Sequence, residues 1–136
     1  MLVGLKFSAD ENFLYASGGN DNWILKYTIR NNKLLLKDSL KLGDKWPNKI
    51  SPAGIDIDDK KNLLYVVTKD NNSLYIIDLR TKKIKGQYKL DGEAYTCLLA
   101  PDKRELYITC WGCDKLYLFN TTTKTYCGPL CKKTLC

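Results

Sequence analysis

The stretch IDDKKNLLYVVTKDNNSLYIIDL, from Ile57 to Leu79, decides the fold, because its pattern returns on both sides of it. Its opening phrase ends at Tyr65, and similar phrases are FSADENFLY, which ends at Tyr15, and LAPDKRELY, which ends at Tyr107. These tyrosines lie 50 and 42 residues apart. A period of about 40–50 residues built from short strands is typical of stacked units that cannot bury their apolar surfaces alone.

Each unit reads as four short strands. In the middle unit the predicted strands are Gly54–Asp58, Leu63–Thr68, Ser73–Leu79 and Ile84–Leu90. Clusters rich in Asp, Asn and Lys separate them, and such clusters favour turns. The runs LLYVV and LYIID are almost continuously apolar, which indicates strands that are buried on both faces.

A parallel α/β sheet also buries both faces of its strands, but it needs crossover helices, and no helical stretch of that length is apparent. The segment Leu34–Leu42 is the one that resembles a helix, with Leu36 and Leu40 at helical spacing. It also alternates apolar and polar residues, and it stands where the repeat requires a fourth strand. We therefore predict a strand there.

The predicted fold class is all-β: a partial β-propeller of about three four-stranded antiparallel blades. The blades span approximately residues 1–42, 50–90 and 95–126, and residues 127–136 form an irregular tail rich in Cys and Lys. Pro129 in this tail is unfavourable in a paired strand. Propellers typically hold four to eight blades, so two apolar faces stand open. The chain is therefore expected to belong to a longer protein, as a truncated or frameshifted piece, or to assemble with other chains.

Composition narrows the functional classes. The chain of 136 residues has a net charge of +7, but its cations are spread through predicted turns, which favours solvated turns over a nucleic-acid surface. Histidine is absent, which excludes a Ser-His-Asp or Cys-His relay within the chain. No apolar run approaches the roughly 18 residues that span a bilayer. No signal peptide precedes the first strand, so the protein is cytoplasmic or its true N-terminus is missing.

Several phrases resemble a known family. Leu64–Thr68 followed by Asn71–Asp78 is similar to the YVTN-type propeller repeat, and Ala100–Tyr107 resembles another phrase of that repeat. The stretches Gly18–Trp23 and Gly43–Lys49, with the sequence CWGC from residue 110 to 113, resemble bacterial YncE-like propellers that precede an alkaline-phosphatase-like phosphoesterase domain.

The resemblance implies a propeller of about seven blades in a periplasmic or secreted protein. Here three blades are present, and the phosphoesterase domain with its metal ligands and nucleophile is not. No catalytic residue therefore carries over. Whether the whole protein is an enzyme stays open, and catalysis is expected only in regions outside this chain.

A candidate binding site lies at one end of the blades. The loop between the second and third strands opens at the same end as the link to the next blade, and loops on a rigid scaffold often bind ligands. The candidate ligand residues there are Asn20, Asn22, Trp46, Asp70, Asn72, Trp111 and Asp114.

Three of these residues, Asn22, Asn72 and Asp114, share one repeat position. Such a set of amides and a carboxylate beside tryptophans suits a small polar ligand, such as a sugar or a cation. The alternative is that these residues simply form turns. Trp46 is either an exposed aromatic anchor or a plug between blades.

The six cysteines allow three interpretations. Cys110 and Cys113 form a disulfide across their turn, or they are structural thiols. With Cys127 and Cys131 they have nearly the spacing of a zinc ribbon, with Cys136 in reserve. Because the repeat already explains Cys110 and Cys113, we predict no metal site and no cofactor. Cys97 is read as a small buried apolar residue.

The leading hypothesis is a non-catalytic YVTN or YncE-like propeller segment that scaffolds a binding face, with further blades or a downstream domain as partners. The alternative is a piece of an enzyme: either the propeller part of a phosphoesterase or part of a propeller lactonase-like hydrolase. A zinc-ribbon nucleic-acid binder is a third hypothesis. No nucleic acid and no membrane are expected as partners.

Overall fold

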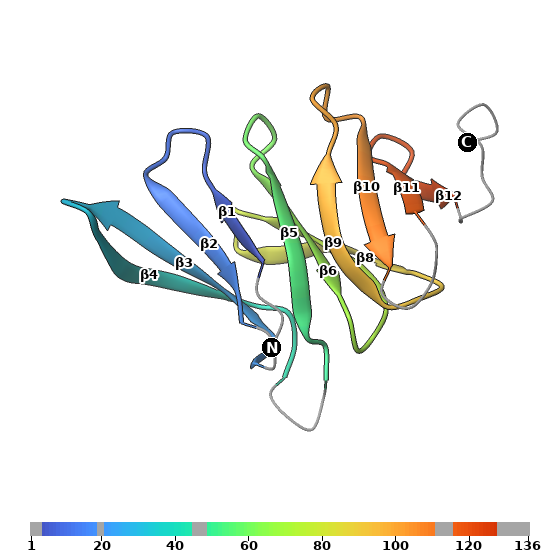
Figure 1. Cartoon of the computed structure of the whole chain (residues 1–136), viewed down its shortest axis with the longest axis horizontal. Helices are drawn as coiled ribbons and strands as arrows, with labels where there is room; N and C mark the ends of the chain where they lie inside the picture. The colour runs from blue at the N-terminus through green and yellow to red at the C-terminus, as the bar shows by residue number, and fades with distance from the viewer. Residues whose placement is uncertain (1–3, 19–20, 45–48, 111–115, 128–136) are drawn as a thin grey trace.

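Short apolar strands joined by tight polar turns form three sheets that stand side by side (Figure 1). The computed structural model describes residues 4–18, 21–44, 49–110 and 116–127. Within these ranges each sheet has four antiparallel strands in chain order. The predicted fold class, a partial propeller of about three blades, is confirmed.

The strand bounds follow the repeat. The first sheet holds β1 (Leu5–Phe7), β2 (Phe13–Ser17), β3 (Trp23–Arg30) and β4 (Lys33–Lys41). The second sheet holds β5 (Pro52–Asp58), β6 (Leu63–Thr68), β7 (Ser73–Asp78) and β8 (Lys83–Lys89). The third sheet holds β9 (Ala94–Leu99), β10 (Glu105–Cys110), β11 (Leu116–Asn120) and β12 (Thr125–Cys127).

Most sequence-based boundaries are within one or two residues of these bounds. The segment around Leu36 is a strand, because its backbone pairs with β3 along its whole length. The tail begins one residue later than predicted, because the short fourth strand of the third sheet, β12, ends at Cys127. Two of the three residues of β12, up to Tyr126, lie before the predicted tail, and the strand ends two residues before Pro129.

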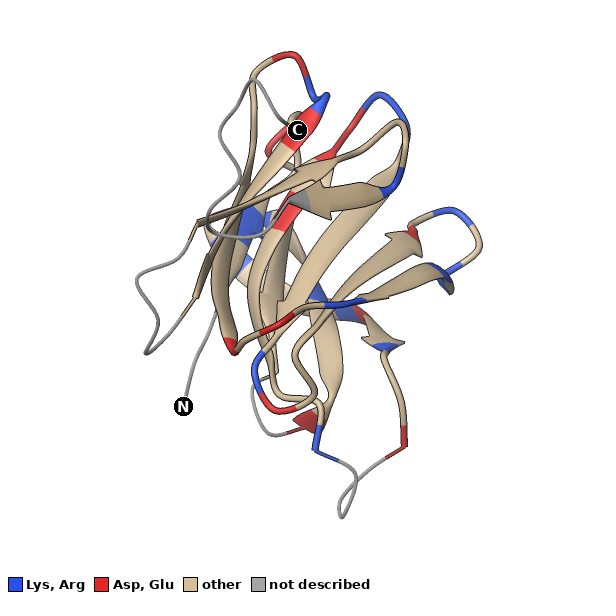
Figure 2. Ribbon diagram, turned by 90° about the vertical axis from the view of Figure 1, so that its right-hand side faces the viewer, with Lys and Arg blue, Asp and Glu red and all other residues tan. Residues whose placement is uncertain are grey.

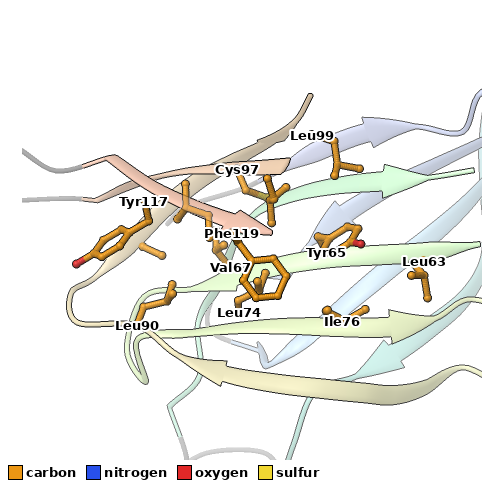
Figure 3. Close-up of a cluster of buried hydrophobic side chains, with 13 residues drawn as sticks. Leu63, Tyr65, Val67, Leu74, Ile76, Leu90, Cys97, Leu99, Tyr117 and Phe119 are labelled. Atoms are coloured by element: carbon orange, nitrogen blue, oxygen red, sulfur yellow. The ribbon is translucent and has the colours of Figure 1, made fainter. Parts of the chain in front are cut away.

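Two apolar cores lie between the three sheets. The first core joins the first and second sheets, and it contains Tyr15, Ile24, Leu64 and Val66 among others. The second core joins the second and third sheets, and Figure 3 shows Tyr65, Val67 and Phe119 within it. Since the second sheet faces a core on both sides, every residue of β6 is buried. This explains the continuous apolar run that the sequence shows there.

Turns at matching repeat positions share the same left-handed backbone conformation. Asn32, Lys82 and Lys124 occupy the same position between the third and fourth strands, and their φ angles are 60°, 61° and 61°. Left-handed backbone suits Asn better than Lys. Asn22 and Asn72 share another position, between the second and third strands, with φ angles of 56° and 48°.

The first strands of the sheets, β1, β5 and β9, lie side by side in Figure 1. Two glycines at one repeat position allow this close approach. A Cβ at Gly4 would lie 2.3 Å from the carbonyl oxygen of Ala53, and a Cβ at Gly54 would lie 2.4 Å from the Cα of Thr96. Both neighbours are backbone atoms, so a larger residue would force the blades apart.

The outer sheets each leave one face open. The open face of the first sheet carries Leu5, Phe7, Leu14, Ala16, Leu25, Tyr27, Ile29, Leu34 and Leu36, as the strand registers show. The open face of the third sheet carries Thr96, Leu98, Glu105, Tyr107, Thr109, Leu116 and Leu118. Phe7 is 56% exposed and Leu98 is 61% exposed. Both faces therefore place large apolar side chains in water.

Among the described residues, Lys and Arg are distributed over several separate parts of the fold. Figure 2 shows Lys and Arg spread over several turns, interspersed with Asp and Glu. The expectation that the chain does not bind nucleic acid remains a prediction. Among the described residues, no helix has the length and apolar character needed to cross a membrane.

Candidate functional site

Hydrogen bonds tie the predicted binding loops into one structure, which we call the loop platform: Asn22, Ile50, Ser51, Lys69 and Asp70. The side chain of Asn22 reaches the linker between the first two sheets. Its Oδ1 accepts from the backbone N–H groups of Ile50 and Ser51, at 2.9 and 3.2 Å, and its Nδ2 donates to the carbonyl of Asp44 at 2.9 Å. The linker is thus fixed to the first sheet.

The same linker is also fixed to the second sheet. The backbone N–H groups of Lys69 and Asp70 donate to the carbonyls of Ser51 and Ile50, at 3.0 and 3.2 Å. The Ser51 hydroxyl donates to Oδ2 of Asp70. Ser51 has a φ of 54°, which is unusual for a residue other than glycine. Loops of two neighbouring blades are therefore held in one arrangement.

The predicted site residues occupy different environments on this platform. Asn22 is buried, with 1% of its surface exposed, so its amide holds the scaffold together and is not presented to solvent. Asp70 is exposed, and its carboxylate lies at the surface beside Ser51. Asn72 lies in the turn after Asp70, where its carbonyl accepts from the N–H of Leu90 at 2.6 Å. Both residues thus help to form the fold, and a ligand role for Asn72 stays a prediction.

The remaining predicted residues lie outside the described residues: Asn20, Trp46, Trp111, Asp114 and Cys113. The proposed Cys110–Cys113 disulfide and the zinc-ribbon alternative therefore stay untested. Cys97 is buried at 7% exposure within the second core, as its apolar interpretation predicted. Burial, followed by the nearby Asp56 carboxylate, raises the pKa of the Cys97 thiol, which keeps it protonated and unreactive.

Sequence reasoning missed Asp56, a buried carboxylate on β5. Its Oδ1 accepts from the N–H of Ile57 at 2.8 Å and pairs with Nζ of Lys6 on β1 at 3.1 Å. Its Oδ2 accepts from the N–H of Leu99 on β9 at 2.6 Å. One side chain thus joins the first strands of all three sheets. The signal in the sequence was a charged residue in the apolar strand GIDID, which requires a partner when buried.

Asp56 lies beside an open groove of about 520 Å³ along these first strands. The groove is at the end of the blades opposite the loop platform, where Asp59 and Lys103 stand on the turns after the first strands. Its walls include the exposed Phe7 and Leu98. Lys6 also lines the groove. The groove therefore offers the ammonium groups of Lys6 and Lys103 and the exposed carboxylate of Asp59 above an apolar surface.

A smaller cavity of about 200 Å³ lies between the first two sheets. The ammonium group of Lys26 stands 4.0 Å from the centre of the Phe13 ring and 5.6 Å from that of Tyr15. Lys26 occupies the repeat position that Ile76 and Leu118 fill in the other sheets. The cation–π contacts provide Lys26 with a partner at a site that is apolar elsewhere.

Several solved structures resemble this fold. The hydrazine synthase of Kuenenia stuttgartiensis has a TM-score of 0.78 and 16% identity, over 92% of this chain and 34% of that chain. A periplasmic gluconolactonase of Pseudomonas aeruginosa has a TM-score of 0.72 and 18% identity, over 90% of this chain and 36% of its own. A protein from Lactobacillus plantarum has a TM-score of 0.73 and 16% identity, over 91% of this chain and 39% of its own.

These neighbours are β-propellers. This chain spans little more than a third of their length, so those proteins extend well beyond the part that this chain matches. Likeness at this identity shows the fold alone, since many unrelated functions share a fold. No protein-family model matches the sequence, and no curated protein does.

Proposed function

We propose that this chain is a non-catalytic segment of a larger propeller of the YVTN or YncE-like kind, which acts as a binding scaffold. The observation that supports this best is the loop platform. Asn22, Ser51 and Asp70 fix the loops of two blades to each other, and two apolar cores hold the sheets beneath them. Loops held on a rigid base lose little conformational freedom when they bind, which favours affinity.

The partners of the scaffold are further blades or a downstream domain. The open faces of the first and third sheets support this part of the proposal, because they carry apolar residues in the positions that are buried within the second sheet. The YVTN-like phrases also support a periplasmic or secreted protein, as does the likeness in fold to the periplasmic gluconolactonase of P. aeruginosa.

The ligand proposed for the loop platform is small and polar, such as a sugar or a cation. Asp70 is its described contact, because its carboxylate is exposed while Ser51 orients it. Asn20, Trp46, Asn72, Trp111 and Asp114 belong to the same proposal through their places in the sequence.

A second candidate is a piece of a hydrolase, either phosphoesterase-linked or lactonase-like. The groove beside Lys6 and Asp59 favours it, since an ammonium and a carboxylate stand on an accessible surface there. Asp56 is a weaker catalytic candidate, because both of its oxygens already accept hydrogen bonds from the backbone and one also pairs with Lys6.

Binding at the loop platform is tested by NMR titration of the purified chain with glucose and with Ca²⁺. The expected result is a set of shifts around Asp70 that Asp70→Ala removes. Asp102→Ala is the matched control, since Asp102 is also an exposed turn carboxylate, at the opposite end of the blades. Shifts that persist in Asp70→Ala would move the site elsewhere.

The scaffold role is tested by assaying the chain with gluconolactone and with 4-nitrophenyl phosphate. The expected rate is that of buffer alone. Turnover that Lys6→Met abolishes would overturn the non-catalytic proposal in favour of the groove as an active site.

A further inference from the structure

The two interfaces inside the chain show how one blade covers the next. We call the face of a sheet that points toward the next sheet along the chain its following face, and the opposite face its preceding face. In both interfaces the following face of one sheet contacts the preceding face of the next sheet. On the following face, Tyr15 and Tyr65 are 3% and 0% exposed. On the preceding face, Ile57 and Leu99 are 3% and 8% exposed. The same two kinds of face are the ones that stand open at the ends of the stack.

The open face of the first sheet is a complete preceding face. Its Leu5, Phe7 and Leu14 stand where the second sheet has Ile55, Ile57 and Leu64, all of which are buried. The open face of the third sheet is a following face, and Tyr107 stands at the position of Tyr15 and Tyr65. We propose that these two open faces bind each other between two copies of this chain, head to tail.

Charge complementarity supports a second copy as the partner. Glu105 stands at the repeat position of Phe13, and Arg30 at that of Arg80. Phe13 and Arg80 line the same cavity between the first two sheets. By the same geometry Glu105 of one copy meets Arg30 of the other. A carboxylate replaces an apolar residue at the position where the second copy supplies a guanidinium group.

The number of blades gives the size of the assembly. Three sheets per chain, joined at both ends by this contact, make a ring of six blades from two copies. Six lies within the range of four to eight blades that is typical of propellers. A heterologous contact of this kind closes into a ring when the rotation per copy permits it.

One residue limits the fit. Thr96 stands at the repeat position of Gly4 and Gly54, whose missing Cβ atoms allow neighbouring first strands to approach. In the contact between copies, the Cβ of Thr96 faces the backbone of the partner near its Gly4. Thr96 therefore holds the strands apart and weakens the association. This inference rests on the proposed role of the open faces as blade-docking surfaces.

Sedimentation equilibrium of the full chain tests the proposal. The mass is expected to rise with concentration from 15.6 kDa toward twice that value. Thr96→Gly should tighten the dimer at least about tenfold, which corresponds to about 1.4 kcal/mol. Thr96→Val keeps the Cβ atom and should match the wild type. If the wild type and Thr96→Gly both remain at 15.6 kDa, or if Thr96→Gly is no tighter than Thr96→Val, the proposal is overturned.

Charge substitutions locate the two faces. Phe7→Glu or Leu98→Glu should weaken the dimer at least about a hundredfold, with Leu5→Glu as a second variant of the first face. Leu35→Glu is the control, because Leu35 is 55% exposed on the opposite face of β4. A dimer that survives Phe7→Glu and Leu5→Glu contradicts the proposal.

Mixing the variants distinguishes head-to-tail from face-to-face pairing. Phe7→Glu keeps an intact third sheet, and Leu98→Glu keeps an intact first sheet, so an equal mixture should form a one-to-one complex. The mixture restores one of the two contacts in the ring, so it should associate more tightly than either variant alone. If it associates no more tightly than either variant alone, the contact is not head to tail. A folded monomer would overturn the association and leave the scaffold role standing, whereas hydrolytic turnover would overturn the scaffold role and leave the association standing.

Discussion

The first and second sheets carry the same repeat in different surroundings. Leu64 on β6 is 0% exposed between two neighbouring sheets, whereas its counterpart Leu14 on β2 is only partly buried. Ile57 is 3% exposed, and its counterpart Phe7 is 56% exposed. The comparison teaches that burial in this fold depends on the presence of a neighbouring blade, and not on residue type alone.

The largest expected effect comes from truncating Leu64, and its counterpart Leu14 provides the comparison. Leu64→Ala should lower the free energy of unfolding by about 3 kcal/mol, because it leaves a cavity in a closed core. Leu14→Ala should lower it by about 1 kcal/mol, because water already reaches that face. Urea unfolding of both variants, each made in the Phe7→Glu background so that association does not cover the first sheet, measures the difference. Equal losses would mean that the first sheet is covered after all.

The loop platform offers a second comparison, between Asn22 and Asn72. Asn22→Gly removes the acceptor of two buried N–H groups, so we expect a loss of about 2.5 kcal/mol. The Oδ1 of Asn72 has no hydrogen-bond partner among the described residues, so Asn72→Gly should cost less than about 1 kcal/mol. Glycine accepts the left-handed backbone at both positions, so backbone strain cancels. Thermal unfolding that ranks the two variants in reverse would contradict this assignment.

The structure also predicts alkaline sensitivity of the closed core. Burial, with a contribution from Asp58, raises the pKa of Tyr65 to about 12, against about 10 in an unfolded chain. The neutral phenol therefore stabilises the fold fully below about pH 10, and this contribution is lost as the pH rises through about 12. The expected loss at pH 12 is on the order of 2 kcal/mol.

Tyr65→Phe is the control for this pH dependence. It should unfold less steeply than the wild type between about pH 10 and 12. At pH 7 its stability should lie within about 1 kcal/mol of the wild type, since the Tyr65 hydroxyl has no hydrogen-bond partner among the described residues. Parallel pH profiles for the two proteins would show that Tyr65 does not cause the loss.

The smallest effect is expected where the sheets meet at the surface. Lys82, in the turn before β8, pairs with Asp38 on β4 and lowers the pKa of that carboxyl group. The Lys82 side chain is 57% exposed. Lys82→Ala should therefore change the free energy of unfolding by less than about 0.5 kcal/mol, and salt should reduce the change further. A larger, salt-resistant loss would indicate a contact that the exposed pair does not explain.

Much of the fold could be predicted because the three units of the repeat can be compared with one another. The bounds of β6, Leu63–Thr68, follow from an apolar run between two turn clusters, and agreement between units identified β4 as a strand. The contacts between units were less accessible. The partners of the Asn22 side chain at Ile50 and Ser51 are 28 and 29 residues away, and no local pattern points to them. The bonds from Asp56 to Lys6 and Leu99 are equally non-local.

For the candidate site, the sequence left two roles open. The shared position of Asn22 and Asn72 was visible, but the same residue types make turns and bind ligands, so sequence could not separate the two roles. Burial places the Asn22 amide inside the scaffold, which the sequence does not report for a polar residue, whereas Asn72 is half-buried and its ligand role stays a prediction. Matching glycines at residues 4 and 54 were also visible, but the backbone approach that requires them appears only once the sheets are stacked.

Native-state hydrogen exchange tests the central claim, that neighbouring blades protect one another, most directly. The monomeric Phe7→Glu variant should be used, so that association does not cover the first sheet. We predict that amides of β6 and β7 exchange only through global unfolding. Those of β2 and β3 should exchange through local opening, which requires less free energy than global unfolding. Equal protection of the two sheets, or slower exchange in β2 and β3, would contradict the account.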